Sequence, residues 1–214
     1  MGTRKPRQPI EQSEFDRLPM ATHTVAARRW VNLRFAKWAN EKTLFYANPE
    51  SRLTPVRMDV PCLYLAQTEA SAFQELYGDK LYLAKEAKAQ LLITEEECKE
   101  RVFVTVQTKE VVLCDLVDEG AAQKIGLDSG TLYDEQLSFP QSFAERIYHH
   151  PARVDGIRYL SRHTNERCVV LWERTPNSGL AKLVAGVDTR LCDRAVARGL
   201  DAIELFGDIL GLIK

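Results

Sequence analysis

The chain lacks any long hydrophobic run. No stretch approaches the roughly 18 consecutive apolar residues of a membrane-spanning helix, so we expect no membrane association. The basic residues near the start are not followed by an apolar segment, unlike those of an ordinary secretory signal peptide. From these two absences we expect a cytoplasmic protein.

Common nucleotide-binding and metal-binding motifs are also missing. Neither GxGxxG nor GxxxxGKS/T occurs, so a Rossmann dinucleotide site and a P-loop are not supported. The five cysteines are odd in number and scattered, with no CxxC or Cys/His ligand spacing. We therefore expect reduced, structural thiols and no metal site. For His149, His150 and His163 we expect capping or surface roles rather than catalysis.

The chain has almost no net charge. Its 29 Lys and Arg residues nearly balance its 30 Asp and Glu residues, which gives a formal charge of -1. A general attraction to nucleic acid is therefore absent. The dense basic group of Arg4, Lys5 and Arg7 is soon followed by acidic residues, so we interpret it as a solvated tail. We expect no direct nucleic-acid partner.

The length and composition are sufficient for one domain with appendages. The chain has 214 residues, of which 45% are hydrophobic. Residues 1–20 contain three prolines and many polar side chains, so we expect a flexible or loosely docked arm. The main domain is placed at residues 21–176. Residues 177–214 have helical apolar spacing and predict a helical extension packed on the domain, with an interface, such as that of a homodimer, as the alternative.

Apolar segments of different period alternate irregularly along the domain. Helices are predicted at residues 69–76, with Thr68 as N-cap, and at 141–148, while residues 25–38 fit a helix or a helix followed by a strand. The predicted strands are 62–66, 102–106, 111–116, 157–160 and 168–173. Neighbouring strands lie too close together for βαβ crossovers throughout, which favours a single mixed-sheet α+β domain.

Four polar side chains stand in or beside these apolar segments. They are Arg52 in SRLTP, Tyr64 in PCLYLA, Glu75 in TEASAFQEL and Ser161 at the end of VDGIRYLS. Together they offer a cation, an aromatic face, a carboxylate and a hydroxyl. This set can hold a dinucleotide and break its N-glycosidic bond, so we expect an enzyme.

The order of the motifs resembles the RES domain family. The matching segments are SRLTP, PCLYLAQTEASAFQE, VVLCDL, IGLD, a glutamine-containing helix, VDGIRYLS and CVVLWE, over roughly residues 30–174. The family is named for Arg, Glu and Ser residues, and its members are toxins of bacterial toxin–antitoxin pairs. This chain departs from the pattern at Leu53, where many members have an aromatic residue after the arginine.

The resemblance implies a fold related to ADP-ribosyltransferases and an activity on NAD. NAD would be the substrate, cleaved by hydrolysis or phosphorolysis, with protein ADP-ribosylation in some members; no other cofactor is implied. Water, inorganic phosphate or a protein side chain would accept the ADP-ribosyl group. The family also implies neutralisation by an antitoxin with an Xre-type DNA-binding part.

Two arginines are candidates for the phosphates of NAD. The planar guanidinium of Arg52 can pair with phosphate oxygens in a bidentate manner. Its ordinary alternative is a surface ion pair. Arg34, in NLRF, matches the position of a second family arginine and could reach the same phosphates, although a solvated helix face is an equal alternative.

The other candidates would act at the nicotinamide ribose. Tyr64 faces away from Leu63 and Leu65 and could stack on the cationic nicotinamide ring, or it could be a core tyrosine. The Glu75 carboxylate could stabilise positive charge on the ribose. Ser161 could hydrogen-bond the ribose or the amide, although serines at strand ends are commonly turn residues.

A binding module is the competing interpretation. A catalytically inactive RES-like domain would only hold a nucleotide or a protein partner. The joint presence of Arg52, Tyr64, Glu75 and Ser161 favours an enzyme, because a scaffold has no need of all four.

Overall fold

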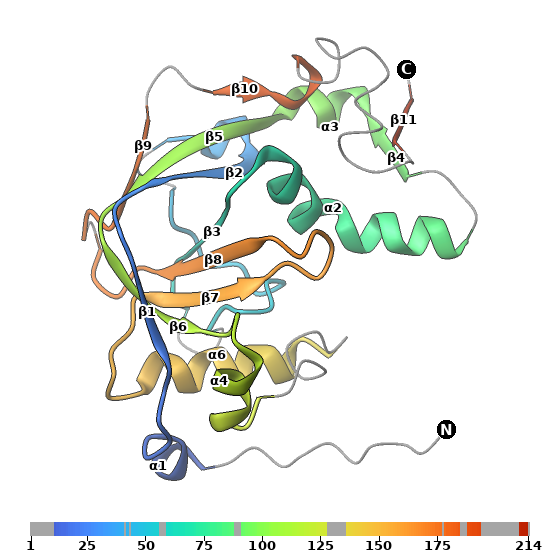
Figure 1. Cartoon of the computed structure of the whole chain (residues 1–214). Coiled ribbons are helices and arrows are strands. Elements are labelled where there is room, and N and C mark those ends of the chain that lie inside the picture. Colours follow the sequence, from blue (N-terminus) through green and yellow to red (C-terminus); the bar gives the residue numbers. More distant parts are fainter. Residues whose placement is uncertain are drawn as a thin grey trace.

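The computed structural model describes residues 11–40, 42, 44–55, 59–87, 91–127, 136–176, 178–184, 188–193 and 210–213 (Figure 1). The helices are α1 (Gln12–Phe15), η1 (Ala36–Trp38), α2 (Glu69–Glu86), α3 (Glu95–Glu100), α4 (Glu119–Lys124) and α6 (Ser138–His149). The strands are β1 (Thr22–Val25), β2 (Arg29–Phe35), β3 (Cys62–Ala66), β4 (Leu91–Thr94), β5 (Arg101–Thr108), β6 (Val111–Asp115), β7 (Gly156–Leu160), β8 (Arg167–Trp172), β9 (Ala181–Leu183), β10 (Thr189–Arg190) and β11 (Leu210–Ile213).

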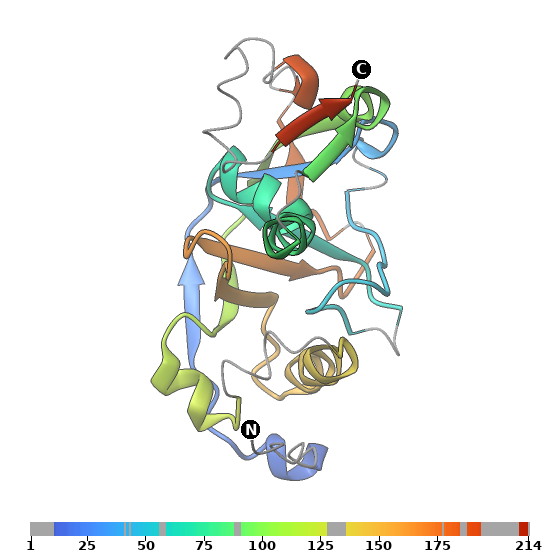
Figure 2. The ribbon, with the colours of Figure 1, turned by 90° about the vertical axis from the view of Figure 1, so that its right-hand side faces the viewer.

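A curled mixed sheet forms the centre of the molecule. Its strands follow the order β1-β6-β7-β8-β3-β2-β5-β10, and β9 also pairs with β5. The β6–β7 pair is parallel and the other pairs of this sheet are antiparallel. Helix α2 lies beside β2 and β3, and α6 lies at the end near β6 and β7 (Figures 1 and 2). The predicted α+β class is confirmed.

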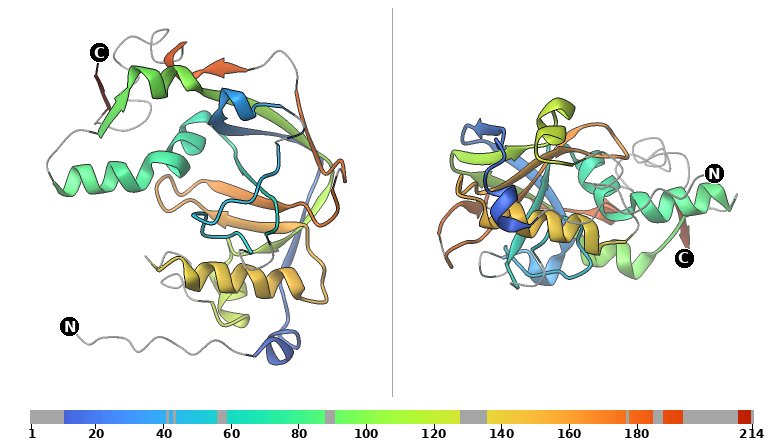
Figure 3. Two further views of the ribbon diagram at one scale, coloured as in Figure 1. Left: turned by 180° about the vertical axis from the view of Figure 1, so that it is seen from behind. Right: turned by 90° about the horizontal axis from the view of Figure 1, so that it is seen from below.

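One long antiparallel ribbon gives the sheet its curl. Thr22 pairs with Cys114 and Val25 with Val111, and the same register continues where Arg29 pairs with Gln107. The ribbon bends between these pairs, so β1–β6 and β2–β5 lie in different parts of the sheet (Figures 1 and 3). Residues 25–38 were expected to begin as a helix, and this is wrong. The segment is held instead by pairing with a strand distant in the sequence, which local periodicity does not reveal.

The two faces of the sheet carry separate hydrophobic clusters. Cys62 and Ala66 of β3 pack in a cluster with Phe73 of α2. Leu63 and Leu65 pack in the other cluster. This alternation is the consequence of the two-residue period of a strand.

The segment before β1 contributes to the core. Phe15 of α1 is 1% exposed, and its ring meets those of Phe143 and His150 edge to face. Gln12 also donates a hydrogen bond to the Arg146 carbonyl oxygen of α6, and Figure 3 shows α1 beside α6 from below. The docked structure therefore begins before the expected boundary at residue 21. Residues 1–10 of the predicted arm lie outside the described residues.

In the C-terminal segment, for which a helical extension was predicted, residues 191–193 are helical and the other described elements are strands. β9 and β10 pair with β5, and β11 pairs with β4 in parallel. Unpaired backbone groups along β5 and β4 accept extended partners, whereas Gly211 lowers the helix propensity of its segment. Leu191 is 3% exposed. The expected helical residues between 194 and 209 lie outside the described residues.

Among the described helices, none has both the length and the apolar character needed to cross a membrane. The cysteines in the described part are free, and four of the five are buried. Burial raises the pKa of the Cys62 and Cys114 thiols to about 12. These thiols therefore stay protonated near neutral pH, as structural thiols do.

Candidate functional site

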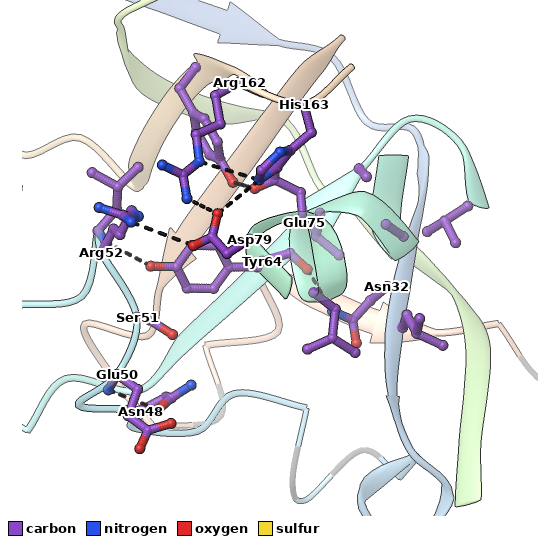
Figure 4. A pocket seen from close by; sticks show the side chains of 18 of the residues that line it. Asn32, Asn48, Glu50, Ser51, Arg52, Tyr64, Glu75, Asp79, Arg162 and His163 are labelled. Atoms are coloured by element: carbon purple, nitrogen blue, oxygen red, sulfur yellow. Dashed lines mark hydrogen bonds and ion pairs between the residues drawn. The ribbon is translucent and has the colours of Figure 1, made fainter. Parts of the chain in front are cut away.

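A cavity of about 340 Å³ opens beside α2. Its wall includes parts of β2 and β3, the loop between Tyr46 and Leu53, the cavity-facing side of α2, and the end of β7 with the turn that follows it (Figure 4). Segments far apart in the sequence thus meet here. Arg52, Tyr64 and Glu75 of the predicted set all line this cavity.

Helix α2 aims Glu75 into the cavity. The helix begins after Thr68, whose hydroxyl oxygen accepts a hydrogen bond from the Ser71 N–H at 3.1 Å, so the predicted N-cap is confirmed. Phe73 and Tyr77 are buried on the opposite side and hold the helix in place. The helix was predicted to end at residue 76, with Glu75 in its last turn. It continues to Glu86, so Glu75 lies inside the helix.

Tyr159 of β7 fixes the Glu75 carboxylate. Its hydroxyl donates a hydrogen bond of 2.6 Å to Glu75 Oε2. Burial, and next the negative charge of Glu75, raise the pKa of Tyr159 well above its ordinary value. The phenol therefore keeps its proton and remains a donor, and hydrogen bonds to an ionised acceptor are the stronger kind.

Tyr64 forms a wall of the cavity. It lies on the side of β3 opposite to Leu63 and Leu65, as predicted. Burial raises the pKa of its phenol, which stays neutral. The stacking of this ring on nicotinamide stays a prediction.

Three side chains hold the loop that carries Arg52. The Tyr64 hydroxyl accepts a hydrogen bond from the Leu53 N–H at 2.9 Å, and Trp172 Nε1 donates to the Leu53 carbonyl oxygen at 3.1 Å. Gln141 of α6 donates to two further carbonyl oxygens of the loop, at 2.6 and 3.1 Å. The position of Arg52 is therefore set by β3, β8 and α6 together.

Asp79 gathers three basic side chains one helical turn beyond Glu75. Its carboxylate forms ion pairs with Arg162 and, at 3.6 Å, with Arg52. His163 Nε2 lies 3.2 Å from Asp79 Oδ1. Figure 4 shows these side chains converging on Asp79, and we call the four residues the Asp79 cluster.

His163 in the Asp79 cluster is held neutral by its surroundings. Burial, and next the positive charge of Arg162, lower its pKa below the ordinary value of 6.5. Its Nε2 also lies 3.3 Å from Arg162 Nε, so this nitrogen can accept from the guanidinium or donate to Asp79, depending on the tautomer. The ring packs directly on α2 at Gly78, where an added methyl group would collide with it.

Arg34 is not among the residues that line the cavity, so the structure does not bring it together with Arg52, Tyr64 and Glu75 there, and its contact with the phosphates stays a prediction. The side chain is 3% exposed, and it donates hydrogen bonds to Asn32 Oδ1 at 2.7 Å and to the Leu44 carbonyl oxygen at 2.8 Å. Asn32 in turn donates to the Tyr64 carbonyl oxygen at 2.8 Å. Arg34 therefore supports the wall through its neighbours, because strand pairing, which the sequence did not reveal, turns it inward.

Ser161 also lies beneath the surface of the site. It is 2% exposed, and its Oγ accepts hydrogen bonds from the N–H groups of His163 and Thr164, at 3.3 and 3.4 Å. This is the geometry of a turn-forming serine. Ser161 thus positions the turn whose Arg162 and His163 side chains line the cavity.

The model of the RES domain matches residues 22–194. This chain belongs to the RES domain family. The predicted family is thereby confirmed, and the match reaches beyond the expected boundary at residue 176. No curated protein matches the chain.

A solved structure shares the fold of this RES domain. A chain of the crystal structure of the M. tuberculosis MbcT–MbcA toxin–antitoxin complex superposes with a TM-score of 0.58 at 17% sequence identity. The similarity covers 79% of this chain and 88% of that chain. At this identity the likeness concerns the fold.

Several residues of the RES domain site were missed by the sequence analysis. They are Asp79, Tyr159 and Arg162, together with His163, for which a capping or surface role was expected. A signal existed for Asp79, which lies one helical turn after Glu75 and so shares its face. Arg162 and His163 directly follow the predicted Ser161. Within the described part of the chain, no group of three or more His, Cys, Asp or Glu side chains could hold a metal ion.

Proposed function

We propose that this RES domain consumes NAD by breaking the bond between nicotinamide and ribose. The observation that carries the proposal is the placement of Glu75, whose carboxylate is fixed by a neutral phenol in a cavity that also contains two arginines. A carboxylate in this position is suited to a reaction that creates positive charge. The arginines are suited to a substrate that carries phosphates.

In the proposed pose, NAD lies along the cavity, and its pyrophosphate and its nicotinamide ribose contact different side chains. Its pyrophosphate would contact Arg52 and Arg162 in the Asp79 cluster, and its nicotinamide ribose would lie at Glu75. The Tyr64 ring, which lines the wall between these groups, would stack on the cationic nicotinamide ring. This placement holds the scissile bond near the carboxylate before the reaction begins, which lowers the entropic part of the barrier.

The chemical step is the heterolysis of the C1′–N bond. The bonding electron pair leaves with nicotinamide, which becomes neutral, and positive charge develops on the ribose. Glu75 stabilises that charge, as carboxylates do in glycoside cleavage. Tyr159 is a positioning residue, because it holds Glu75 and does not itself touch the substrate in this scheme.

The acceptor completes the reaction at C1′. If water attacks, it loses a proton and gives ADP-ribose. If inorganic phosphate attacks, the product is ADP-ribose phosphorylated at that carbon; a protein side chain would give a modified protein. Each product has a different mass, so product analysis distinguishes the three.

A toxin of a toxin–antitoxin pair is the biological role that we propose. The family membership and the fold shared with a chain of a toxin–antitoxin complex support it. The partner in this proposal is a protein antitoxin with an Xre-type DNA-binding part. The location is the cytoplasm, where NAD depletion would stop growth.

The test is incubation of the purified, antitoxin-free protein with NAD, followed by chromatography and mass spectrometry with and without phosphate. We expect nicotinamide to be released. Glu75→Gln is the inactive control, and Glu86→Gln is the matched one, because Glu86 is exposed on the same helix outside the cavity lining. Intact NAD after long incubation with folded protein would contradict the proposal and favour a binding module.

A further inference from the structure

The two oxygens of Asp79 occupy the space between two guanidinium groups. Oδ1 pairs with Arg162 and Oδ2 lies 3.6 Å from Arg52. The arginines come from unrelated parts of the chain, one from the loop before β3 and the other from the turn after β7. A single carboxylate thus neutralises two cations that converge on one place.

The two arginines are close enough to affect each other electrostatically. The pKa of Arg162 is lowered, first by burial and next by the positive charge of Arg52. Both side chains remain partly open to solvent, with exposed fractions of 24% for Arg52 and 29% for Arg162. An anion arriving from solvent could therefore reach both.

Asp79 is free to leave this position without disturbing the core. Its side chain is 53% exposed and stands on the surface of α2. The buried residues that hold the helix, Phe73 and Tyr77, lie on its other side. Rotation of the Asp79 side chain would break its ion pairs with both guanidinium groups while the backbone of α2 remained in place.

We infer that Asp79 is an internal competitor for the diphosphate-binding position made by Arg52 and Arg162. A diphosphate has oxygens on two phosphorus atoms, so it can contact two guanidinium groups at once. The two oxygens of a single carboxylate are closer together and span a shorter distance. The ligand must displace Asp79, so its apparent affinity is lower than the affinity of the arginine pair alone. The inference rests on the proposed function only in taking a diphosphate as the natural ligand group.

The test is a calorimetric titration with inorganic pyrophosphate, which requires no NAD cleavage. Asp79→Asn removes the charge and keeps the size of the side chain. We expect it to bind pyrophosphate about 5-fold or more tightly than the wild type. Asp79→Ala is a second neutral variant. It is expected to act in the same direction because it also removes the competing charge, and alanine preserves the helix.

Two controls keep the charge argument specific. Glu86→Gln removes one negative charge from the same helix outside the cavity lining and should change the affinity less than 2-fold, by the screening of exposed charges. Asp79→Glu keeps the competing charge and should remain about as weak as the wild type.

The inference is overturned if Asp79→Asn leaves the affinity unchanged, or if Glu86→Gln raises it equally. It is also overturned if both neutral variants bind more weakly, because Asp79 would then organise the arginines for the ligand. Absence of pyrophosphate binding in the wild type and the neutral variants has the same consequence. Tighter binding without any NAD cleavage would reject the proposed function and leave the inference standing.

Discussion

Two carboxylates of the cavity, one helical turn apart on α2, have different partners. Glu75 accepts a hydrogen bond from the neutral, buried Tyr159. Asp79 is half exposed and is surrounded by Arg52, Arg162 and His163. A neutral donor fixes the Glu75 carboxylate without cancelling its charge, whereas the cations cancel that of Asp79. In the proposed reaction Glu75 would stabilise the developing positive charge, and the ligand phosphates would replace Asp79 at the arginines.

The two carboxylates also differ in how much they must move when a ligand binds. The groups around Glu75 are held by a buried helix face and a buried strand, so they need little rearrangement for the reaction. Asp79 lies on the solvent side and must move when a ligand binds. Substitutions around Glu75 should change turnover, and those around Asp79 should change affinity.

The largest expected effect is that of Glu75→Gln. A neutral amide of the same shape cannot stabilise positive charge on the ribose, so turnover should fall by on the order of 100-fold or more. Single-turnover release of nicotinamide measures this loss. Pyrophosphate affinity should change much less than turnover, although the Glu75 charge acts on Arg162, because pyrophosphate contacts the arginines directly in the proposed pose. Turnover within a few-fold of the wild type would show that another group is the catalytic carboxylate.

Arg52→Ala should act on affinity rather than on chemistry. A charge-assisted pair with phosphate contributes roughly 1.5 to 3 kcal/mol, which corresponds to about 10- to 150-fold in the dissociation constant for NAD. Nicotinamide mononucleotide lacks the pyrophosphate and should lose less. Calorimetric titration of both ligands compares them directly, and equal losses would assign a structural role to Arg52.

Tyr159→Phe should lower turnover by about 10-fold, less than Glu75→Gln, because the carboxylate remains but loses its fixed donor. Its effect on the Michaelis constant should be small. Comparison of kcat with the Michaelis constant over a range of NAD concentrations measures the two separately. A loss confined to the Michaelis constant would contradict the positioning role. Thermal unfolding serves as the control for the removed hydroxyl.

The smallest effect is expected from the titration of His163. Its folded-state pKa is lowered, so the unfolded chain takes up a proton first as the pH falls through 6.5. Stability that is present above this pH should be lost between 6.5 and the lower folded-state pKa. Denaturant unfolding at about pH 7.5 and pH 5.5 should show a smaller loss for His163→Gln than for the wild type. An equal loss in both proteins would assign the pH dependence to other groups.

The sequence placed the residues around Glu75 better than those that surround Asp79. Tyr64 faces away from Leu63 and Leu65 because alternation is a local property of a strand, and Thr68 caps α2 because capping is equally local. Both could be predicted without knowing which strands pair. The Asp79 cluster depends instead on the approach of the loop before β3, the middle of α2 and the turn after β7.

Similar reasoning explains why two predicted residues lie outside the cavity lining. Arg34 and Ser161 were chosen for their types and their positions in motifs, and both are buried as supports rather than exposed in the cavity. The direction of a side chain relative to a cavity is fixed by the partners of its strand or turn. For Arg34 the relevant partner strand lies more than sixty residues away in the sequence, between Arg101 and Thr108.

By itself the sequence determined the RES domain motifs, the α+β class, the strand character of residues 62–66 and the helix that carries Glu75, because periodicity, capping and motif order are carried by neighbouring residues. Only the tertiary structure decided that a bent ribbon curls the sheet, that β9, β10 and β11 pair as strands, and that Asp79 lies between Arg52 and Arg162. These outcomes depend on backbone pairing and on charge contacts between segments that are distant in the sequence. Local sequence patterns do not reveal which distant segments will meet.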